Sequence, residues 1–124
     1  MAVDPANPEV IYILSSVRPT GSAAGMDVHF VRSLDGALNW SAPVRVNDDP
    51  ASAPAWHWFG MLSVAPNGRL DVVWNDTRND PSNPDPETSE LFYSFSLDLG
   101  ESWSSNVPVS PPFNHFLGYP QQEK

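Results

Sequence analysis

The sequence predicts an all-β protein made of short antiparallel strands joined by firm turns. Fourteen prolines and seven glycines punctuate its 124 residues, and the apolar runs between them have the length of strands. Signals that start or stop a helix are nearly absent. An eight-residue pattern also occurs twice, at residues 33–40 and 96–103. Self-similarity at a period of tens of residues predicts stacked supersecondary units.

The first 50 residues (1–50) predict an incomplete unit, because only the end of its first strand is present, at Ala2 and Val3. Asp-Pro and Asn-Pro pairs then predict a turn. Residues 9–17 form a continuous apolar run, as in a strand buried on both faces. Residues 26–32 alternate as a third strand would, and residues 43–46 supply a short fourth strand that tolerates proline at its start.

Residues 51–112 predict a complete unit of four strands. The Asn67 and Gly68 pair favours a type I′ hairpin turn between its first two strands. The strands are expected at residues 56–64, 69–74, 90–95 and 107–109. Residues 113–124 are expected to begin a following unit or to form a tail.

The repeated pattern suits a tight turn between two strands. Ser96 and Asp98 can accept hydrogen bonds from nearby backbone N–H groups, and Gly100 can take the positive φ that such a turn requires. Trp103 then returns the chain to an apolar layer. The pattern therefore predicts a turn that is stabilised by its own side chains.

This order of residues resembles the Asp-box, or BNR, repeat of sialidase-like β-propellers. The downstream copy matches at every position, whereas the upstream copy keeps Ser33, Asp35 and Trp40 but has Ala37 for glycine and Asn39 for serine or threonine. We therefore expect the upstream turn to be distorted or shifted onto the preceding glycine. The resemblance implies about two four-stranded antiparallel blades of a six-bladed propeller, as a fragment or an oligomer-forming partial propeller, with a structural role for the motif.

Composition argues against several classes of partner. The net charge of −9, from 15 acidic and 6 basic side chains, disfavours nucleic acid and anionic membrane surfaces. The lack of cysteine excludes disulfides and thiolate metal sites. No apolar run approaches the roughly 18 residues of a membrane span, and the first residues lack the regions of a signal peptide. The compartment stays open, and an extracellular or periplasmic parent protein is compatible with the sequence.

The order of strands predicts where a ligand would bind. In a four-stranded meander, the turn between strands one and two lies at the same end as the turn between strands three and four, so both Asp-boxes share one end. Residues 18–25, 47–57 and 75–89 then gather at the opposite end, and the last of these is the longest connection. Long loops of this kind are often functional.

That opposite end carries the side chains of a candidate sugar site. Arginine can pair with a sugar carboxylate, aromatic faces pack on sugar rings, and a carboxylic acid can protonate a leaving oxygen. The candidates are Arg18, Arg78, Trp56, His57 and Trp58 for binding and Asp76 and Asp80 for catalysis. The alternative is structural: ion pairs with neighbouring aspartates for the arginines and a turn cap for Asp76. The other tryptophans, Trp40, Trp74 and Trp103, are expected in the core.

The loop at residues 76–87 also contains oxygen ligands of the type that calcium uses. The acidic side chains there are Asp76, Asp80, Asp85 and Glu87. Their spacing does not match an EF-hand and three prolines interrupt it, so a solvated loop is the better interpretation. No cofactor is expected, and no histidine spacing indicates a metal site.

The resemblance implies exo-acting glycoside hydrolysis of the sialidase class. Its enzymes use a tyrosine nucleophile with a glutamate partner, an aspartic acid catalyst and three arginines that hold the sugar carboxylate. Here Tyr12 and Tyr93 fall within strands and Tyr119 in the tail, and no tyrosine–glutamate pair can be assigned. Our first hypothesis is a partial sialidase-like propeller, inactive by itself, whose three copies would close a six-bladed ring. The alternative is a non-catalytic BNR-repeat module that binds a glycan or a protein.

Overall fold

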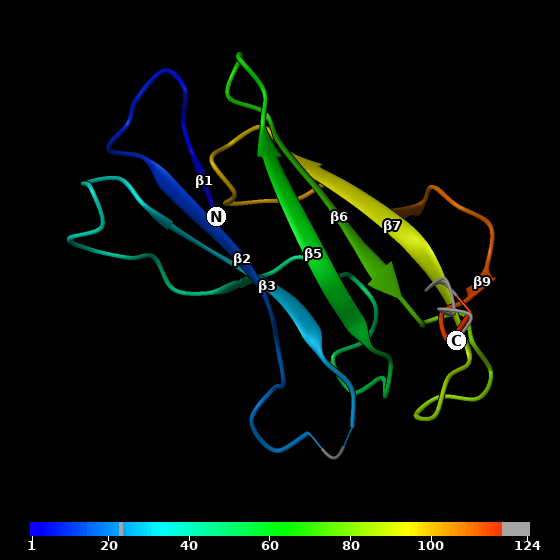
Figure 1. Ribbon diagram of the computed structural model, residues 1–124. Helices are drawn as coiled ribbons and strands as arrows, with labels where there is room; N and C mark the ends of the chain where they lie inside the picture. Colours follow the sequence, from blue (N-terminus) through cyan, green and yellow to red (C-terminus); the bar gives the residue numbers. More distant parts are fainter. Residues whose placement is uncertain (23, 118–124) are drawn as a thin grey trace, which may run out of the picture.

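The computed structural model describes residues 1–22 and 24–117, and within them it contains strands and no helix (Figure 1). Two antiparallel sheets face each other, which confirms the predicted all-β class. The first sheet contains β1 (Ala2–Val3), β2 (Ile11–Val17), β3 (Asp27–Ser33) and β4 (Val44–Arg45), in that order. The second contains β5 (His57–Val64), β6 (Leu70–Asp76), β7 (Thr88–Ser96), β8 (Val107–Pro108) and β9 (Phe113–Asn114), with β9 also paired to β7.

The central strands of the two sheets pair in the same register. In the first sheet Ile11 lies opposite Ser33, and in the second Leu70 lies opposite Ser96. Ser33 and Ser96 are the first residues of the two copies of the repeated pattern. Each residue of β3 therefore corresponds to the residue of β7 that lies 63 positions later in the sequence. The sequence repeat is therefore also a structural repeat.

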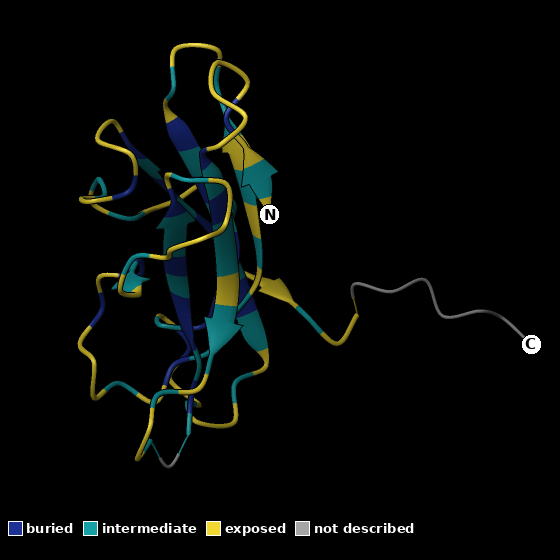
Figure 2. Cartoon of the chain, turned by 90° about the vertical axis from the view of Figure 1, so that its left-hand side faces the viewer, coloured by how far each residue is buried: buried dark blue, intermediate teal, exposed yellow. Residues whose placement is uncertain are grey.

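Each sheet has two faces, because side chains alternate along a strand. We name the face with Ile11 and Ile13, and the matching face with Leu70 and Val72, the front; the opposite face of each sheet is the rear. The rear of the first sheet packs on the front of the second. The buried core contains Val10, Tyr12, Val28, Phe30, Val46, Leu70, Val72, Trp74 and Phe92. Figure 2 shows this burial as dark bands along the strands.

The upstream Asp-box turn is held by its own side chains. Ser33 Oγ donates to Asp35 Oδ1 at 2.9 Å and accepts the Ala37 N–H at 2.9 Å, and Asp35 Oδ1 also accepts the Asn39 N–H at 2.9 Å. Gly36 has a φ of 68° and Ala37 a φ of 72°.

The downstream turn repeats these bonds. Ser96 Oγ donates to Asp98 Oδ1 at 2.7 Å and accepts the Gly100 N–H at 2.9 Å, and Asp98 Oδ1 accepts the Ser102 N–H at 2.9 Å. Leu99 and Gly100 have φ values of 60° and 82°, at the positions that match Gly36 and Ala37. The expected distortion of the upstream turn is wrong, because the bonds to serine and aspartate hold Ala37 itself in the left-handed region.

The tryptophans differ in burial. Trp74 is fully buried, and the half-buried Trp103 packs edge-on against Phe30 with ring centroids 5.2 Å apart. Trp40 is 41% exposed, so its expected place in the core is wrong. Trp40 occupies in the first sheet the position that Trp103 has in the second, but among the described residues no third sheet lies beside it.

Phe113 and Asn114 pair with Ser89 and Thr88 at the start of β7. The paired part of the second unit therefore extends past residue 112, into the segment expected to begin another unit. Residues 118–124, with Tyr119, lie outside the described residues.

Candidate functional site

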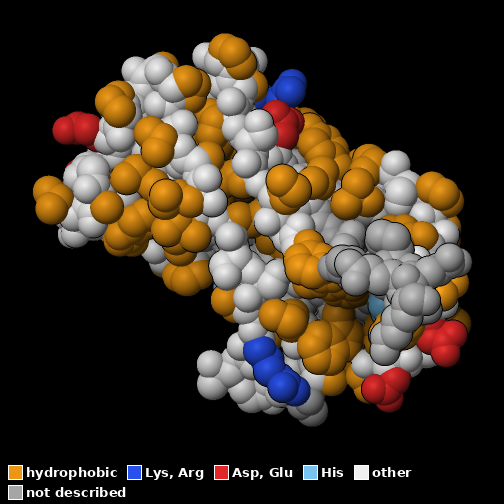
Figure 3. Space-filling model, viewed as in Figure 1, with side chains coloured by type: hydrophobic (Ala, Val, Ile, Leu, Met, Phe, Trp, Pro, Cys, Tyr) orange, Lys and Arg blue, Asp and Glu red, His pale blue; other side chains and the backbone are white. Residues whose placement is uncertain are grey.

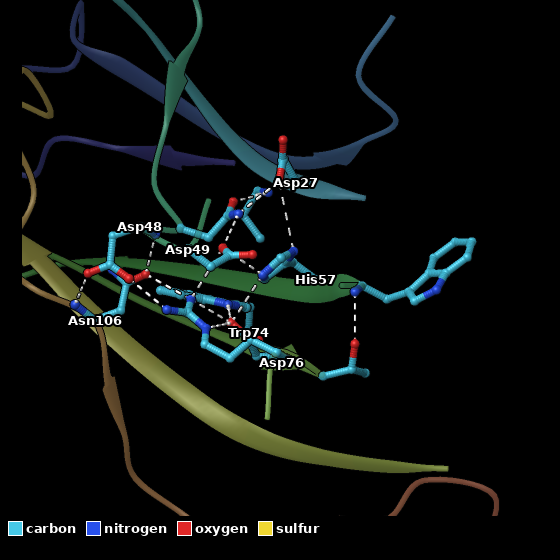
Figure 4. Close-up of polar contacts among 12 residues, drawn as sticks. Asp27, Asp48, Asp49, His57, Trp74, Asp76 and Asn106 are labelled. Atoms are coloured by element: carbon cyan, nitrogen blue, oxygen red, sulfur yellow. Dashed lines mark hydrogen bonds and ion pairs between the residues drawn. The ribbon is translucent and has the colours of Figure 1, made fainter. Parts of the chain in front are cut away.

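A cluster of charged and polar side chains lies between the two sheets, at the end opposite the Asp-boxes (Figure 4). It brings together His57, Asp76 and Arg78 from the predicted set. We call it the His57 cluster, and its members are Asp27, Arg45, Asn47, Asp48, Asp49, His57, Trp74, Asp76, Arg78 and Asn106. The first five come from the first sheet and the loop after it, and the others from the second sheet and the loops that connect its strands.

His57 is at the centre and only 1% exposed. Its Nδ1 contacts the backbone carbonyl oxygen of Met26, and its Nε2 lies 3.1 Å from Asp49 Oδ1 and 3.3 Å from Asp76 Oδ2. Each ring nitrogen thus lies close to an oxygen atom, although Nε2 is not aligned for a hydrogen bond with either carboxylate. The two nearby negative charges favour the imidazolium cation.

The pKa values follow from this geometry. Burial alone lowers the pKa of His57, but the contacts with Asp49 and Asp76 and their negative charges raise it to about 9. Burial acts in the opposite direction on the carboxyl groups, and the histidine again outweighs it. The pKa of Asp49 is lowered to about 2, with Asn47 contributing, and that of Asp76 is lowered by His57 and Arg78.

Arg78 is fully engaged by carboxylates. Its Nη2 donates to Asp76 Oδ2 at 2.7 Å, its Nε to the same oxygen at 2.9 Å, and its Nη1 to Asp48 Oδ1 at 2.6 Å. The guanidinium also lies over the ring of Phe92, 4.3 Å from its centroid. Trp74 Nε1 donates a further bond to Asp76 Oδ2 at 2.9 Å. The predicted ion pair is confirmed, and Asp76 Oδ1 accepts the Arg78 N–H as in the predicted turn cap.

Asn47, Asp49 and Arg45 connect the cluster to the first sheet. Asn47 Nδ2 donates to Asp27 Oδ1 and to Asp49 Oδ1, each at 2.8 Å, while Asn47 Oδ1 accepts the Val28 N–H. Arg45 Nη2 lies 3.1 Å from Asp27 Oδ1 and 3.4 Å from Asp49 Oδ1. The cluster is therefore a bridge of ion pairs between two sheets.

This arrangement limits what Asp76 can do chemically. A general acid must be protonated and must reach the substrate. The side chain of Asp76 is fully buried, its pKa is lowered, and its oxygens already accept bonds from Trp74 and Arg78. The geometry gives Asp76 a structural role.

Asp80 fixes the long loop between β6 and β7. Its Oδ2 accepts the Thr88 hydroxyl at 2.6 Å and the N–H groups of Thr88 and Glu87 at 2.7 and 3.1 Å, and its Oδ1 accepts the Ser82 N–H at 2.7 Å. These bonds, the Thr88 hydroxyl first, hold the pKa of Asp80 well below its usual range. Asp80 is thus a carboxylate that closes a loop.

A pocket of about 470 Å³ lies beside this loop. It is lined by Met26, Trp56, Trp58, Pro84, Asp85, Pro86, Glu87, His115 and Phe116. Trp56 Nε1 donates to the Pro84 carbonyl at 2.8 Å, and the ring of His115 stands edge-on to Trp58 at 5.3 Å. Both indole rings are half-buried. The pocket therefore combines aromatic faces with two carboxylates.

The predicted site residues fall into three places. His57 points inward between the sheets, whereas its neighbours Trp56 and Trp58 line the pocket. Arg18 follows the end of β2, is exposed, and does not line that pocket. The structure thus does not gather the two arginines and the aromatic residues into one site.

Sequence reasoning missed Asp27, Arg45, Asn47 and Asn106 in the cluster and His115 in the pocket. The alternation along β5 is a signal that could have separated His57 from the two tryptophans. Asp76 ends β6, and Asp49 follows β4 at the same end of the molecule. This placement was a weaker indication that the two side chains lie close together.

Residues 1–22 and 24–117 contain neither a candidate metal centre nor a candidate membrane-spanning helix. No group of three or more histidine, cysteine, aspartate or glutamate side chains there could hold a metal ion. The oxygens of Asp76 and Asp80 bind protein donors, so the geometry of the loop does not favour the calcium hypothesis. In this part of the chain no helix has the length and hydropathy needed to cross a bilayer. A scan of protein-family models and a search of curated proteins each found no match to this chain.

Proposed function

We propose that this chain forms two consecutive blades of a sialidase-like β-propeller, and that these blades bind a carbohydrate without cleaving it. The blade proposal is supported by two meanders of equal register that each end their third strand in the same Asp-box turn. It is also supported by the way in which the rear of one sheet packs on the front of the next.

The pocket beside Trp56 and Trp58 is the observation that carries the binding proposal. Sugar rings present C–H faces that pack on indole rings, and their hydroxyl groups donate to carboxylates. Here both indoles are half-buried, and Asp85 and Glu87 line the same pocket. A cavity of about 470 Å³ has the size of known small-ligand sites.

The candidate catalysts do not support hydrolysis. Asp76 and Asp80 are carboxylates whose oxygens bind protein donors. The hydroxyl of Tyr93 donates to Asp71 at 2.6 Å, so its carboxylate partner is an aspartate and not the glutamate that a sialidase nucleophile would have. The hydrolase hypothesis thus rests on the resemblance alone.

The charge of the pocket favours a neutral glycan over the carboxylate sugar expected from the sequence. Arg78, which would hold a sugar carboxylate, already pairs with Asp76 and Asp48 and donates to Asn106. The pocket itself contains Asp85 and Glu87 and no arginine or lysine among its lining residues. A negatively charged sugar would meet like charges there.

Titration calorimetry with a panel of neutral oligosaccharides and with sialyllactose tests this proposal. Trp58→Ala should weaken binding of the neutral glycan by at least about tenfold, because it removes one wall of the pocket. Phe59→Ala is the matched control, because Phe59 is the next residue, is 66% exposed and lies outside the pocket. Tighter binding of sialyllactose, or turnover of a fluorogenic sialoside by the purified chain, would contradict the proposal.

A further inference from the structure

We propose that copies of this chain bind one another head to tail, with the rear of the second sheet of one copy covering the front of the first sheet of the next. The contact between the two sheets within the chain is the template. The inference does not depend on the glycan pocket. It depends on which residues the repeat places at equivalent positions.

The template contact combines a ring pair and an ion pair. The ring of Phe30 stands edge-on to Trp103 and lies against Gly100, where an added Cβ would overlap it. Arg32 Nη2 pairs with Glu101 Oε1 at 2.7 Å, and its Nη1 donates to the Leu99 carbonyl at 2.8 Å. These contacts join the rear of the first sheet to the downstream Asp-box.

The ring pair has an equivalent on the two outer faces. Tyr93 corresponds to Phe30 and lies on the rear of the second sheet, where it is only half-buried. Trp40 corresponds to Trp103 and is 41% exposed on the first sheet. In a head-to-tail pair, Tyr93 of one copy would meet Trp40 of the next.

At the equivalent positions of the two outer faces, both partners of this ion pair are replaced by apolar residues. The position of Arg32 is taken by Phe95, and the position of Glu101 is taken by Leu38, which is 81% exposed. A cation and an anion that meet inside the chain thus become two apolar side chains on the two faces that would meet between copies. Two faces that change together in this way match each other, which makes a second copy the occupant we infer.

Other apolar side chains surround these positions. The rear of the second sheet adds Val73, Leu91 and Met61, of which Met61 is 70% exposed, and the front of the first sheet adds Ile11, Ile13 and Val31. On the face of the molecule that Figure 3 presents, hydrophobic side chains lie close together and few charged groups separate them. Exposed apolar surface of this kind marks interaction sites.

The outer faces differ from the template at Ala37, which corresponds to Gly100. Its Cβ prevents a ring from approaching the turn as closely as Phe30 does, so the ring of Tyr93 lies further out. Contacts of this head-to-tail type use two different surfaces, and they close into a ring if the rotation between copies allows it. Six blades, as in the resemblance, correspond to three copies.

The test is the mass in solution, by light scattering and sedimentation between about 1 μM and about 100 μM. We expect a discrete oligomer. Leu38→Glu and Phe95→Arg should each weaken it by at least about tenfold. The chain with both substitutions should recover it, because a pair like Arg32–Glu101 is then reproduced at every contact. Ala37→Gly should strengthen it.

Leu34→Glu is the matched control, because Leu34 lies in the same turn and its counterpart Leu97 stays 74% exposed in the template. Circular dichroism checks that each variant is folded. If Phe95→Arg does not fold, the result for Leu38→Glu decides the test. A monomer throughout the concentration range overturns the proposal. So does an oligomer or aggregate that Leu38→Glu leaves unchanged, or that Leu34→Glu weakens equally.

Discussion

Replacement of His57 by glutamine tests the bridge between the sheets. The substitution removes one of the two positive charges that lie between the buried carboxylates of Asp49 and Asp76; the other is Arg78, whose Nη2 lies 3.7 Å from Asp49 Oδ1 and 2.7 Å from Asp76 Oδ2. Removing one partner of a buried ion pair costs about 3 to 5 kcal/mol. The pKa gives a similar figure, because the rise from 6.5 to about 9 corresponds to about 3 kcal/mol at roughly 1.4 kcal/mol per unit.

The dependence on pH has a definite sign. The pKa of His57 is higher in the folded chain, so its contribution is complete below pH 6.5 and is lost as the pH rises through about 9. Asp49 acts at the other end, because its lowered pKa gives stability above pH 3.8 that is lost as the pH falls through about 2. Urea unfolding between about pH 6 and about pH 10 should show the wild type losing about 3 kcal/mol that His57→Gln does not lose.

His115→Gln is the matched control, since His115 lies beside Trp58 in the pocket and is not a member of the His57 cluster. Equal pH dependence in the wild type and in His57→Gln would refute the reasoning. If His57→Gln does not fold, proton NMR of the wild type decides the matter, because the chain has three histidines. The signal of His57 should stay that of the cation to about pH 8, and titration near 6.5 would refute the bridge.

Three further substitutions test the turns. Gly100→Ala should lower the free energy of unfolding by about 3 kcal/mol, because a Cβ is strained at a φ of 82° and overlaps the buried ring of Phe30. Ala37→Gly should raise it by about 1 kcal/mol, since the strain at a φ of 72° is relieved; a urea titration measures both changes, and a lower stability of Ala37→Gly would contradict the account. Asp80→Asn should speed hydrogen exchange of the Thr88 amide without changing the exchange of β6, and unchanged exchange at Thr88 would count against its role in the loop.

The Asp-box turns could be predicted from the sequence because their bonds join residues within eight positions of each other. Ser96, Asp98 and Gly100 have the expected roles, and Ser33 and Asp35 repeat them. The positive φ of Ala37 could not be predicted from the conformational preference of alanine, since the energy of several hydrogen bonds in the turn outweighs the backbone strain at this one residue.

The candidate site was predicted only in part, because its members come from distant segments. The sequence indicated that the loops before β5 and after β6 share one end. It could not show that His57 would meet Asp49 and Asp76, since that depends on how one sheet lies on the other. Trp40 illustrates the same limit: its residue type favours burial, but burial needs a neighbour that the described residues do not include.

The bridge at His57 also has a consequence for shape. Apolar surfaces can slide and rotate on each other at little cost, whereas ion pairs and hydrogen bonds have preferred directions. The core therefore holds the two sheets together, while directional contacts such as those of His57 with Asp49 and of Arg78 with Asp48 fix the angle between them. Any longer array built by repeating this contact takes its curvature from that angle, so a few polar side chains would determine how many sheets complete a circle.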